Sequence, residues 1–246
     1  MTGASSGIGR ATALVMAAQG AKVVVAARRE MESGQVVEEI TSSGGTAAYV
    51  RTDVTEEDQV QAMVEFAVSE FGRLDCAVNN SGGGFRSDAG WPEASPEALR
   101  KTFDLNVFGV WLCMKHEIGA MLERGGGAIV NVSSIAGMRV TLGEAYTSSK
   151  YAVNGLTRSA AAQYGKQGVR VNSVAPGIID AGSWKPRLEA EPDLRAKWND
   201  AIPIGRVGRP EEVGEAIAWL CSDAASYITG AIIPIDGGNT MTINAP

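Results

Sequence analysis

Tyr146 and Lys150 are the two side chains whose types and spacing point most directly to proton-transfer chemistry. Because they are four residues apart, a helix would place them on the same face, one turn from each other. A free phenol has a pKa of about 10 and is a poor acid or base at neutral pH. A neighbouring ammonium favours the phenolate, so we predict that Lys150 lowers the pKa of Tyr146 toward the range where proton transfer is efficient.

Ser133 supplies a hydroxyl for the same chemistry. It follows the apolar run Ala128–Val132, which is typical of a buried strand, so we expect the hydroxyl at a strand end. A strand-end hydroxyl facing the tyrosine suits proton exchange with a carbonyl or alcohol oxygen. The spacing of Tyr146 and Lys150 alone also fits a solvated helix face. A second stretch of the sequence is therefore needed to choose between a catalytic pair and a solvated face.

That second stretch is the glycine-rich segment from Thr2 to Gly9. It runs into an apolar helical pattern from Ile8 to Gln19, which ends at Gly20. Glycines let a backbone approach a pyrophosphate, and the start of the helix offers free N–H groups and a partial positive charge. The same segment also matches the G-x-S-x-G turn of serine hydrolases. That alternative needs a preceding strand and a histidine partner, and the only histidine, His116, lies within a helical pattern.

The glycine-rich segment and the Ser133, Tyr146 and Lys150 set together resemble the short-chain dehydrogenase/reductase family, over nearly the whole chain. The resemblance implies that Tyr146 is the general acid/base and that Lys150 also holds the nicotinamide ribose. Ser133 would hydrogen-bond the substrate oxygen. Asn106, in the stretch Phe103–Gly109, matches the asparagine that holds a water in a proton relay. A dinucleotide-binding protein without catalysis is disfavoured, because all four catalytic positions are filled.

The resemblance also assigns the cofactor contacts. Asp53 and Val54 match residues at the adenine ring, Asn80 matches a ribose contact, and the Ile179 backbone matches the group that binds the nicotinamide carboxamide. The full predicted cofactor set is Gly3, Ser5, Ser6, Gly7, Ile8, Gly9, Arg28, Asp53, Val54, Asn80, Tyr146, Lys150, Pro176, Gly177 and Ile179.

The choice of cofactor is predicted from the end of the strand Lys22–Ala27. A carboxylate there would hydrogen-bond the ribose 2′-OH of NAD, but this chain has Ala27 followed by Arg28 and Arg29. A guanidinium suits a 2′-phosphate, so NADP(H) is favoured and NAD(H) remains possible. Ser6 adds no second positive charge in the glycine loop. The alternative is an NAD-dependent alcohol or sugar dehydrogenase.

The composition of the chain limits the kinds of molecule that the protein is expected to bind. The net charge of −6 argues against nucleic acid or an anionic membrane surface, and no apolar run approaches the roughly 18 residues that span a bilayer. Three cysteines without a C-x-x-C pair predict reduced thiols and a cytoplasmic protein, and with a single histidine we expect no metal site. A small-molecule carbonyl or alcohol is the expected substrate. The resemblance implies a homotetramer or homodimer, joined through the two long central helices and the C-terminal strand region.

Alternating strand and helix patterns predict an α/β fold, a single doubly wound Rossmann-type domain over residues 1–246 with a parallel sheet. Helices are expected to start at Thr55, Ser95 and Pro210. The loop 82–91 and the segment 182–202, a substrate lid by resemblance, would border the substrate. The predicted strands are Lys22–Ala27, Ala47–Arg51, Leu74–Val78, Ala128–Val132, Val169–Val174 and Ala231–Ile235.

We expect the sheet to lack its first strand, because only Met1 and Thr2 precede Gly3. The strands at Val23 and Val78 would then lie about 10 Å apart with unpaired backbone groups between them. We expect that the natural protein starts upstream, or that this form folds poorly, anchors its cofactor loop badly and has impaired activity. Equal melting temperature and NADPH affinity in a chain extended by an apolar strand would refute this expectation.

Overall fold

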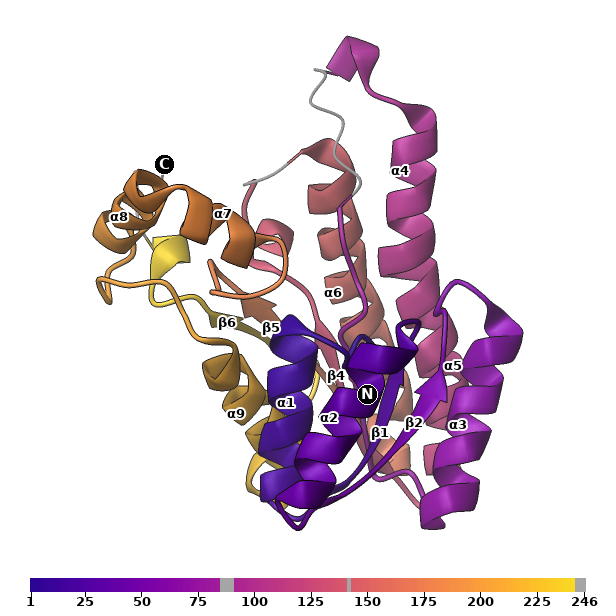
Figure 1. Cartoon of the computed structure of the whole chain (residues 1–246). Coiled ribbons are helices and arrows are strands. Elements are labelled where there is room, and N and C mark those ends of the chain that lie inside the picture. Colours follow the sequence, from indigo (N-terminus) through magenta and orange to yellow (C-terminus); the bar gives the residue numbers. More distant parts are fainter. Residues whose placement is uncertain (85–90, 141–142, 242–246) are drawn as a thin grey trace.

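The computed structural model describes residues 1–84, 91–140 and 143–241, in which parallel strands alternate with helices (Figure 1). β1 pairs with β2, and a second sheet has the order β3-β4-β5-β6. The predicted strands are confirmed within two residues at each end. Their bounds are β1 Lys22–Ala27, β2 Thr46–Arg51, β3 Cys76–Asn79, β4 Gly127–Val132, β5 Val169–Pro176 and β6 Ile232–Ile235.

Helices cover both faces of these sheets (Figure 1). On one face, Val213 and Ile217 of α9 pack against Val130 and Val174 of the sheet. On the other face, the helices α3, α5 and α6 bury apolar side chains against β1, β4 and β5. The fold is therefore the predicted doubly wound α/β arrangement. The first face carries α1 (Gly7–Ala18), α2 (Glu30–Ser42) and α9 (Pro210–Cys221), and the second carries α3 (Glu57–Phe71), α5 (Gly109–Leu122) and α6 (Glu144–Tyr164).

Met1 and Thr2 lie between β1 and β3, which do not pair with each other in the described part of the chain. The Ala26 N–H donates to Met1 O (2.9 Å), and the Thr2 N–H donates to Val78 O (3.0 Å). Beyond this bridge lies a cavity of about 380 Å³, lined by Val24 on one side and Val78 on the other. The predicted gap between the two strands is therefore present, and Met1 and Thr2 close one end of it.

The prediction of a badly anchored cofactor loop is wrong for this structure, because Thr2 fixes the loop to the end of β3. The Thr2 hydroxyl accepts from the backbone N–H groups of Asn80 (3.0 Å) and Ser81 (3.1 Å). The Asn80 amide donates back to the carbonyls of Thr2 (3.1 Å) and Gly3 (3.2 Å). These four hydrogen bonds hold the start of the glycine loop without a full preceding strand.

Two of the three predicted helix starts are confirmed. Ser95 caps α4 (Pro96–Phe103) by accepting from the Ala98 N–H, and Pro210 opens α9. The start at Thr55 is wrong, because the Thr55 N–H and hydroxyl both bond the carboxylate of Asp53. Such local bonds compete with a helix cap, and α3 begins at Glu57 instead.

Between α4 and α5 the chain forms one π-helical turn, Asp104–Phe108. Single π turns occur often at functional sites, and this one carries Asn106. Residues 85–90 of the predicted substrate loop lie outside the described residues. Short 3₁₀ helices occupy Trp91–Glu93, Ile135–Gly137, Gly165–Gln167, Asp223–Ala225 and Asn239–Met241.

The predicted lid segment forms two helices, α7 (Trp184–Ala190) and α8 (Pro192–Ala201). They stand beyond the carboxyl ends of β5 and β6 (Figure 1). The Trp184 and Trp198 rings meet edge-on with centroids 5.6 Å apart, so the two helices pack together. No helix among the described residues is long and apolar enough to cross a membrane.

Candidate active site

A cavity of about 820 Å³ opens where the strands β1 to β5 end, and it brings together nearly all the predicted site residues. Gly9 and Asn106 are the two predicted residues that do not line it. The predicted residues that line it are Gly3, Ser5, Ser6, Gly7, Ile8, Arg28, Asp53, Val54, Asn80, Ser133, Tyr146, Lys150, Pro176, Gly177 and Ile179.

The glycine loop has the shape that a bound pyrophosphate needs. Gly3 and Gly7 have φ values of +64° and +56°, a region that side chains other than glycine rarely adopt. A Cβ on Gly9 would lie 2.2 Å from Gly3 O, so the loop can close onto α1 only with glycine there. Because α1 starts at Gly7 and Gly7 lines the cavity, the free N–H groups of its first turn open onto it. The loop therefore fits a dinucleotide phosphate.

Two arginines lie at the adenosine end of the cavity. Arg29 Nη2 donates to the hydroxyls of Ser5 (2.9 Å) and Ser6 (2.7 Å). Arg28 forms an ion pair with Asp53 (3.5 Å). The glycine loop thus acquires a positive charge that the sequence of the loop does not contain. Sequence reasoning assigned no contact to Arg29, and its only signal was its place beside Arg28.

The electrostatics of Asp53 fit this position. Burial raises the pKa of this carboxyl, but hydrogen bonds from Thr55 and the Arg28 guanidinium outweigh it and lower the pKa below its usual value. Asp53 is therefore ionised at neutral pH and holds Arg28 at the cavity wall.

At the other end, Ile179 presents a free backbone donor. Gly208 donates to Ile178 O (2.9 Å) and accepts from the Asp180 N–H (2.8 Å), as in a parallel strand pair. Since successive residues of an extended chain point their polar groups to opposite sides, the Ile179 N–H is directed away from Gly208, and Ile179 lines the cavity. This N–H has no hydrogen-bond partner among the described residues, so it fits a carboxamide oxygen.

Tyr146 and Lys150 lie in the first two turns of α6, as predicted. Lys150 Nζ donates to Val132 O (3.0 Å) and lies over the Tyr146 ring, 5.5 Å from its centroid. Burial lowers the pKa of Lys150 to about 8. Burial also raises the pKa of Tyr146, and only a hydrogen bond with the Ser134 side chain acts in the opposite direction.

The predicted effect of Lys150 on Tyr146 is therefore wrong for this structure. The ammonium faces the ring and a backbone carbonyl rather than the phenol oxygen, so it does not offset the loss of hydration.

Ser134, not Ser133, faces Tyr146. The Ser133 hydroxyl donates to Lys150 O (3.2 Å) and is buried beneath α6. The chain is extended at Ser134, so its side chain points to the opposite side from that of Ser133 and reaches the tyrosine. Both serines line the cavity. The signal for this assignment was present in the sequence as two consecutive serines, but spacing alone did not decide between them.

Asn106 is fully buried, and its side chain ties the loop after β3 to α6. Its amide donates to Gly83 O (2.8 Å) and to Ser149 Oγ (3.0 Å), while its Oδ1 accepts from the Gly83 N–H (2.9 Å). Gly84 follows directly, and a Cβ there would lie 3.3 Å from the Tyr146 ring. Asn106 thus shapes the cavity wall beside Tyr146, while the relay water remains a prediction.

The hydrolase alternative lacks its base in the described structure. His116 lies on α5, and its Nε2 is 3.3 Å from Glu57 of α3. The Ser5 hydroxyl instead accepts from Arg29. Neither side chain makes the serine–histidine contact that a hydrolase requires.

Comparison with known proteins agrees with this geometry. Residues 3–240 match the family described as "Enoyl-(Acyl carrier protein) reductase". A solved short-chain type dehydrogenase/reductase from Mycobacterium ulcerans superimposes with a TM-score of 0.92 at 35% identity, covering 98% of this chain and 88% of that one. The chain belongs to the short-chain dehydrogenase/reductase family.

The relatives of this short-chain dehydrogenase/reductase include two dehydrogenases of cyclic alcohols. The chain is 44% identical to a 2,5-dichloro-2,5-cyclohexadiene-1,4-diol dehydrogenase of Sphingobium indicum, covering 98% of this chain and 95% of the relative. It is 46% identical to a cis-4-hydroxycyclohexanecarboxylate dehydrogenase of Sinomonas cyclohexanicum, with the same coverage. The protein is therefore an oxidoreductase of a family that uses a nicotinamide dinucleotide.

Proposed function

We propose that this protein is an NADP(H)-dependent oxidoreductase that interconverts a carbonyl and a secondary alcohol, with Tyr146 as the general acid/base. The observation that carries the proposal is the group of Tyr146, Ser134 and the buried Lys150 in the wall of the same cavity onto which the glycine loop opens. One end of the cavity fits a pyrophosphate and the other end has a proton donor.

Different residues of the chain would bind the cofactor and transfer the proton. The first turn of α1 would hold the pyrophosphate, and the Ile179 N–H would hold the carboxamide. When bound, the nicotinamide supplies or accepts hydride. In reduction Tyr146 gives its hydroxyl proton to the substrate oxygen, and in oxidation it takes that proton back. Ser134 donates a hydrogen bond to the same oxygen. The raised pKa of Tyr146 keeps the phenol protonated at neutral pH, so its proton is present for the reduction.

Two guanidinium groups at the adenosine end support NADP(H). Arg28 and Arg29 both line the cavity and directly follow Ala27, the strand end that lacks a carboxylate. Arginine forks match the oxygens of a phosphate. The Arg28 ion pair with Asp53 is the feature that favours the alternative, an NAD-dependent alcohol or sugar dehydrogenase, because that pair offsets part of the positive charge.

We infer that the substrates are alicyclic secondary alcohols and the corresponding ketones. The two relatives named above are both named for six-membered carbon rings that carry a hydroxyl group. The residues that line the cavity include the apolar Leu105, Ala145 and Trp184, which suit a hydrocarbon ring. Trp184 comes from the segment 182–202, which we propose is the lid over this ring.

The experiment is an absorbance assay of the reduced cofactor with NADP(H) and NAD(H). Its substrates are cyclohexanol, cyclohexanone, 4-hydroxycyclohexanecarboxylate, glucose and a 3-oxoacyl thioester. We expect the highest kcat/KM with a cyclohexane derivative and NADP(H). Turnover of glucose alone, or higher kcat/KM with NAD(H), would favour the alternative. No dinucleotide-dependent turnover of any alcohol or carbonyl would contradict the proposal.

A further inference from the structure

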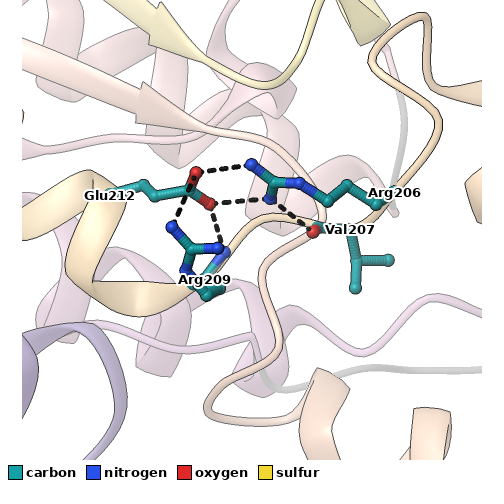
Figure 2. Close-up of polar contacts among 4 residues, drawn as sticks. All are labelled: Arg206, Val207, Arg209 and Glu212. Carbon is teal, nitrogen blue, oxygen red and sulfur yellow. Dashed lines mark hydrogen bonds and ion pairs between the residues drawn. The ribbon is translucent and has the colours of Figure 1, made fainter.

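Glu212 binds two arginines of the segment that connects the lid helices to α9 (Figure 2). The Arg206 guanidinium donates two hydrogen bonds to the Glu212 carboxylate, from Nη1 to Oε2 (2.9 Å) and from Nη2 to Oε1 (2.6 Å). The backbone N–H of Arg209 donates to Oε2 (2.8 Å), and the Arg209 guanidinium lies 3.4 Å from Oε1. Arg206 Nη1 also donates to Val207 O (3.2 Å). We call this group, Arg206, Val207, Arg209 and Glu212, the Glu212 clasp.

The Glu212 clasp encloses Gly208, the residue that pairs with the nicotinamide end of the cavity. Gly208 lies between Val207 and Arg209, and both of its backbone groups bond the turn from Ile178 to Asp180. The Val207 N–H in addition donates to Asn199 Oδ1 of α8 (3.0 Å). Three parts therefore meet here: the start of α9, the end of the lid, and the turn that presents the Ile179 N–H.

We propose that Glu212 is a positioning residue that fixes Gly208 and thereby aims the Ile179 N–H at the nicotinamide carboxamide. The inference rests on the proposed function, because it needs a nicotinamide at that end of the cavity. Glu212 itself does not line the cavity and acts through Gly208.

The clasp is suited to this role because its geometry allows little rotation. A guanidinium that bonds both oxygens of a carboxylate is held in one plane. The Arg206 guanidinium and the Arg209 backbone N–H lower the pKa of Glu212 to about 2, so the carboxylate is ionised throughout the physiological range. Because the Arg209 N–H is a backbone group, the carboxylate holds the main chain next to Gly208 and not only a side chain.

The test compares two ligands that differ in whether they carry a nicotinamide. NADP⁺ or NAD⁺, whichever the wild type binds more tightly, is titrated by calorimetry beside its nicotinamide-free fragment, 2′-phospho-ADP-ribose or ADP-ribose. Glu212→Gln keeps the size of the side chain but replaces one acceptor oxygen with an amide NH2 group, which donates hydrogen bonds. We expect the Kd for the dinucleotide to rise about tenfold, the size of one charge-assisted hydrogen bond. The Kd for the fragment should stay unchanged.

Controls separate positioning from general damage. Glu215→Gln alters an exposed carboxylate on the same helix that bonds Gln19, and it should leave both affinities unchanged. Arg206→Lys keeps the charge but loses the two-point grip, so it should weaken dinucleotide binding as Glu212→Gln does. If Glu212→Gln does not fold, Arg206→Lys replaces it in the comparison of dinucleotide and fragment affinities.

The outcomes are distinct. Equal weakening of dinucleotide and fragment, or unchanged affinity for both, would overturn the role of Glu212 while leaving the proposed function in place. A wild type that binds neither dinucleotide would overturn the proposed function and this inference with it.

Discussion

At the scale of single residues, the Ser134 hydroxyl is expected to matter more for turnover than the Ser133 hydroxyl. Ser134 faces Tyr146, whereas Ser133 bonds the Lys150 carbonyl. Removing one donor from a developing oxyanion costs about 10²–10³ in kcat, so we expect a loss of that size in Ser134→Ala. Ser133→Ala should keep turnover within a few fold. Steady-state kinetics of both variants checks this, and a larger loss in Ser133→Ala would reverse the assignment.

Lys150 gives a pH dependence of stability with a definite sign. Its pKa is lowered from 10.5 to about 8 in the folded chain, so between these values the unfolded chain binds more protons. Stability therefore rises with pH over this window, and the penalty is fully present below pH 8. Wild type should gain up to about 3 kcal/mol relative to Lys150→Met between pH 8 and 10.5. Urea unfolding of both proteins measures this. A difference that does not change with pH would show that Lys150 is not buried as a charged group.

Arg28→Asp tests the cofactor choice. It removes the proposed partner of a 2′-phosphate and adds a carboxylate that would repel a phosphate and suits a 2′-OH. Charge-assisted hydrogen bonds are worth about 1.5–3 kcal/mol, so the NADP/NAD ratio of kcat/KM should fall about tenfold or more. Arg29→Ala should lower the same ratio, because Arg29 lies against Ser6 of the glycine loop. A wild type that already prefers NAD would contradict the assignment.

At the scale of elements, Asn106 in the π turn should act as a tether of the loop after β3. Asn106→Ala removes three hydrogen bonds and leaves the Gly83 backbone groups unpaired. We expect a loss of about 1–3 kcal/mol of stability together with a raised KM. Asn106→Asp keeps the bond from the Gly83 N–H but loses the amide that donates to Gly83 O, and it buries a carboxylate, so it should lose at least as much stability. Denaturant unfolding measures the stability of each variant, and steady-state kinetics measures its KM and kcat. A fall in kcat with unchanged stability would instead support the relay water as the main role.

The elements also show what the sequence could and could not predict. The strands and most helix starts were predictable because apolar runs and the Ser95–Pro96 pair are local signals. The start at Thr55 was not, since the side chain of Asp53 competes for its groups. The choice between Ser133 and Ser134 depends on which way the chain leaves β4. In the Glu212 clasp, the bond from the Arg209 N–H follows the known spacing between the N-cap and the third residue of a helix, whereas the contact with Arg206 depends on the path of the main chain before α9.

At the scale of the whole molecule, exposed aromatic side chains on α5, on α6 and in the π turn before α5 support the expected self-association. Phe108, Trp111 and Tyr151 are 58%, 47% and 48% exposed, although large apolar groups usually lie inside. We expect the protein to be a dimer or tetramer in light scattering. Trp111→Glu, which places a charge on α5, should shift it toward the monomer. A monomeric wild type at micromolar concentration would refute the proposal.

The central claim is that Tyr146 moves the proton in a dinucleotide-dependent reaction, and Tyr146→Phe tests it most directly. The variant keeps the ring against Lys150 but removes the hydroxyl. The measurement is turnover of the best alicyclic substrate, with dinucleotide affinity measured on the same samples. Because general acid–base catalysis contributes about 10²–10⁴-fold, turnover should fall by at least that range while affinity changes little. A variant that retains most of the wild-type turnover would contradict the account.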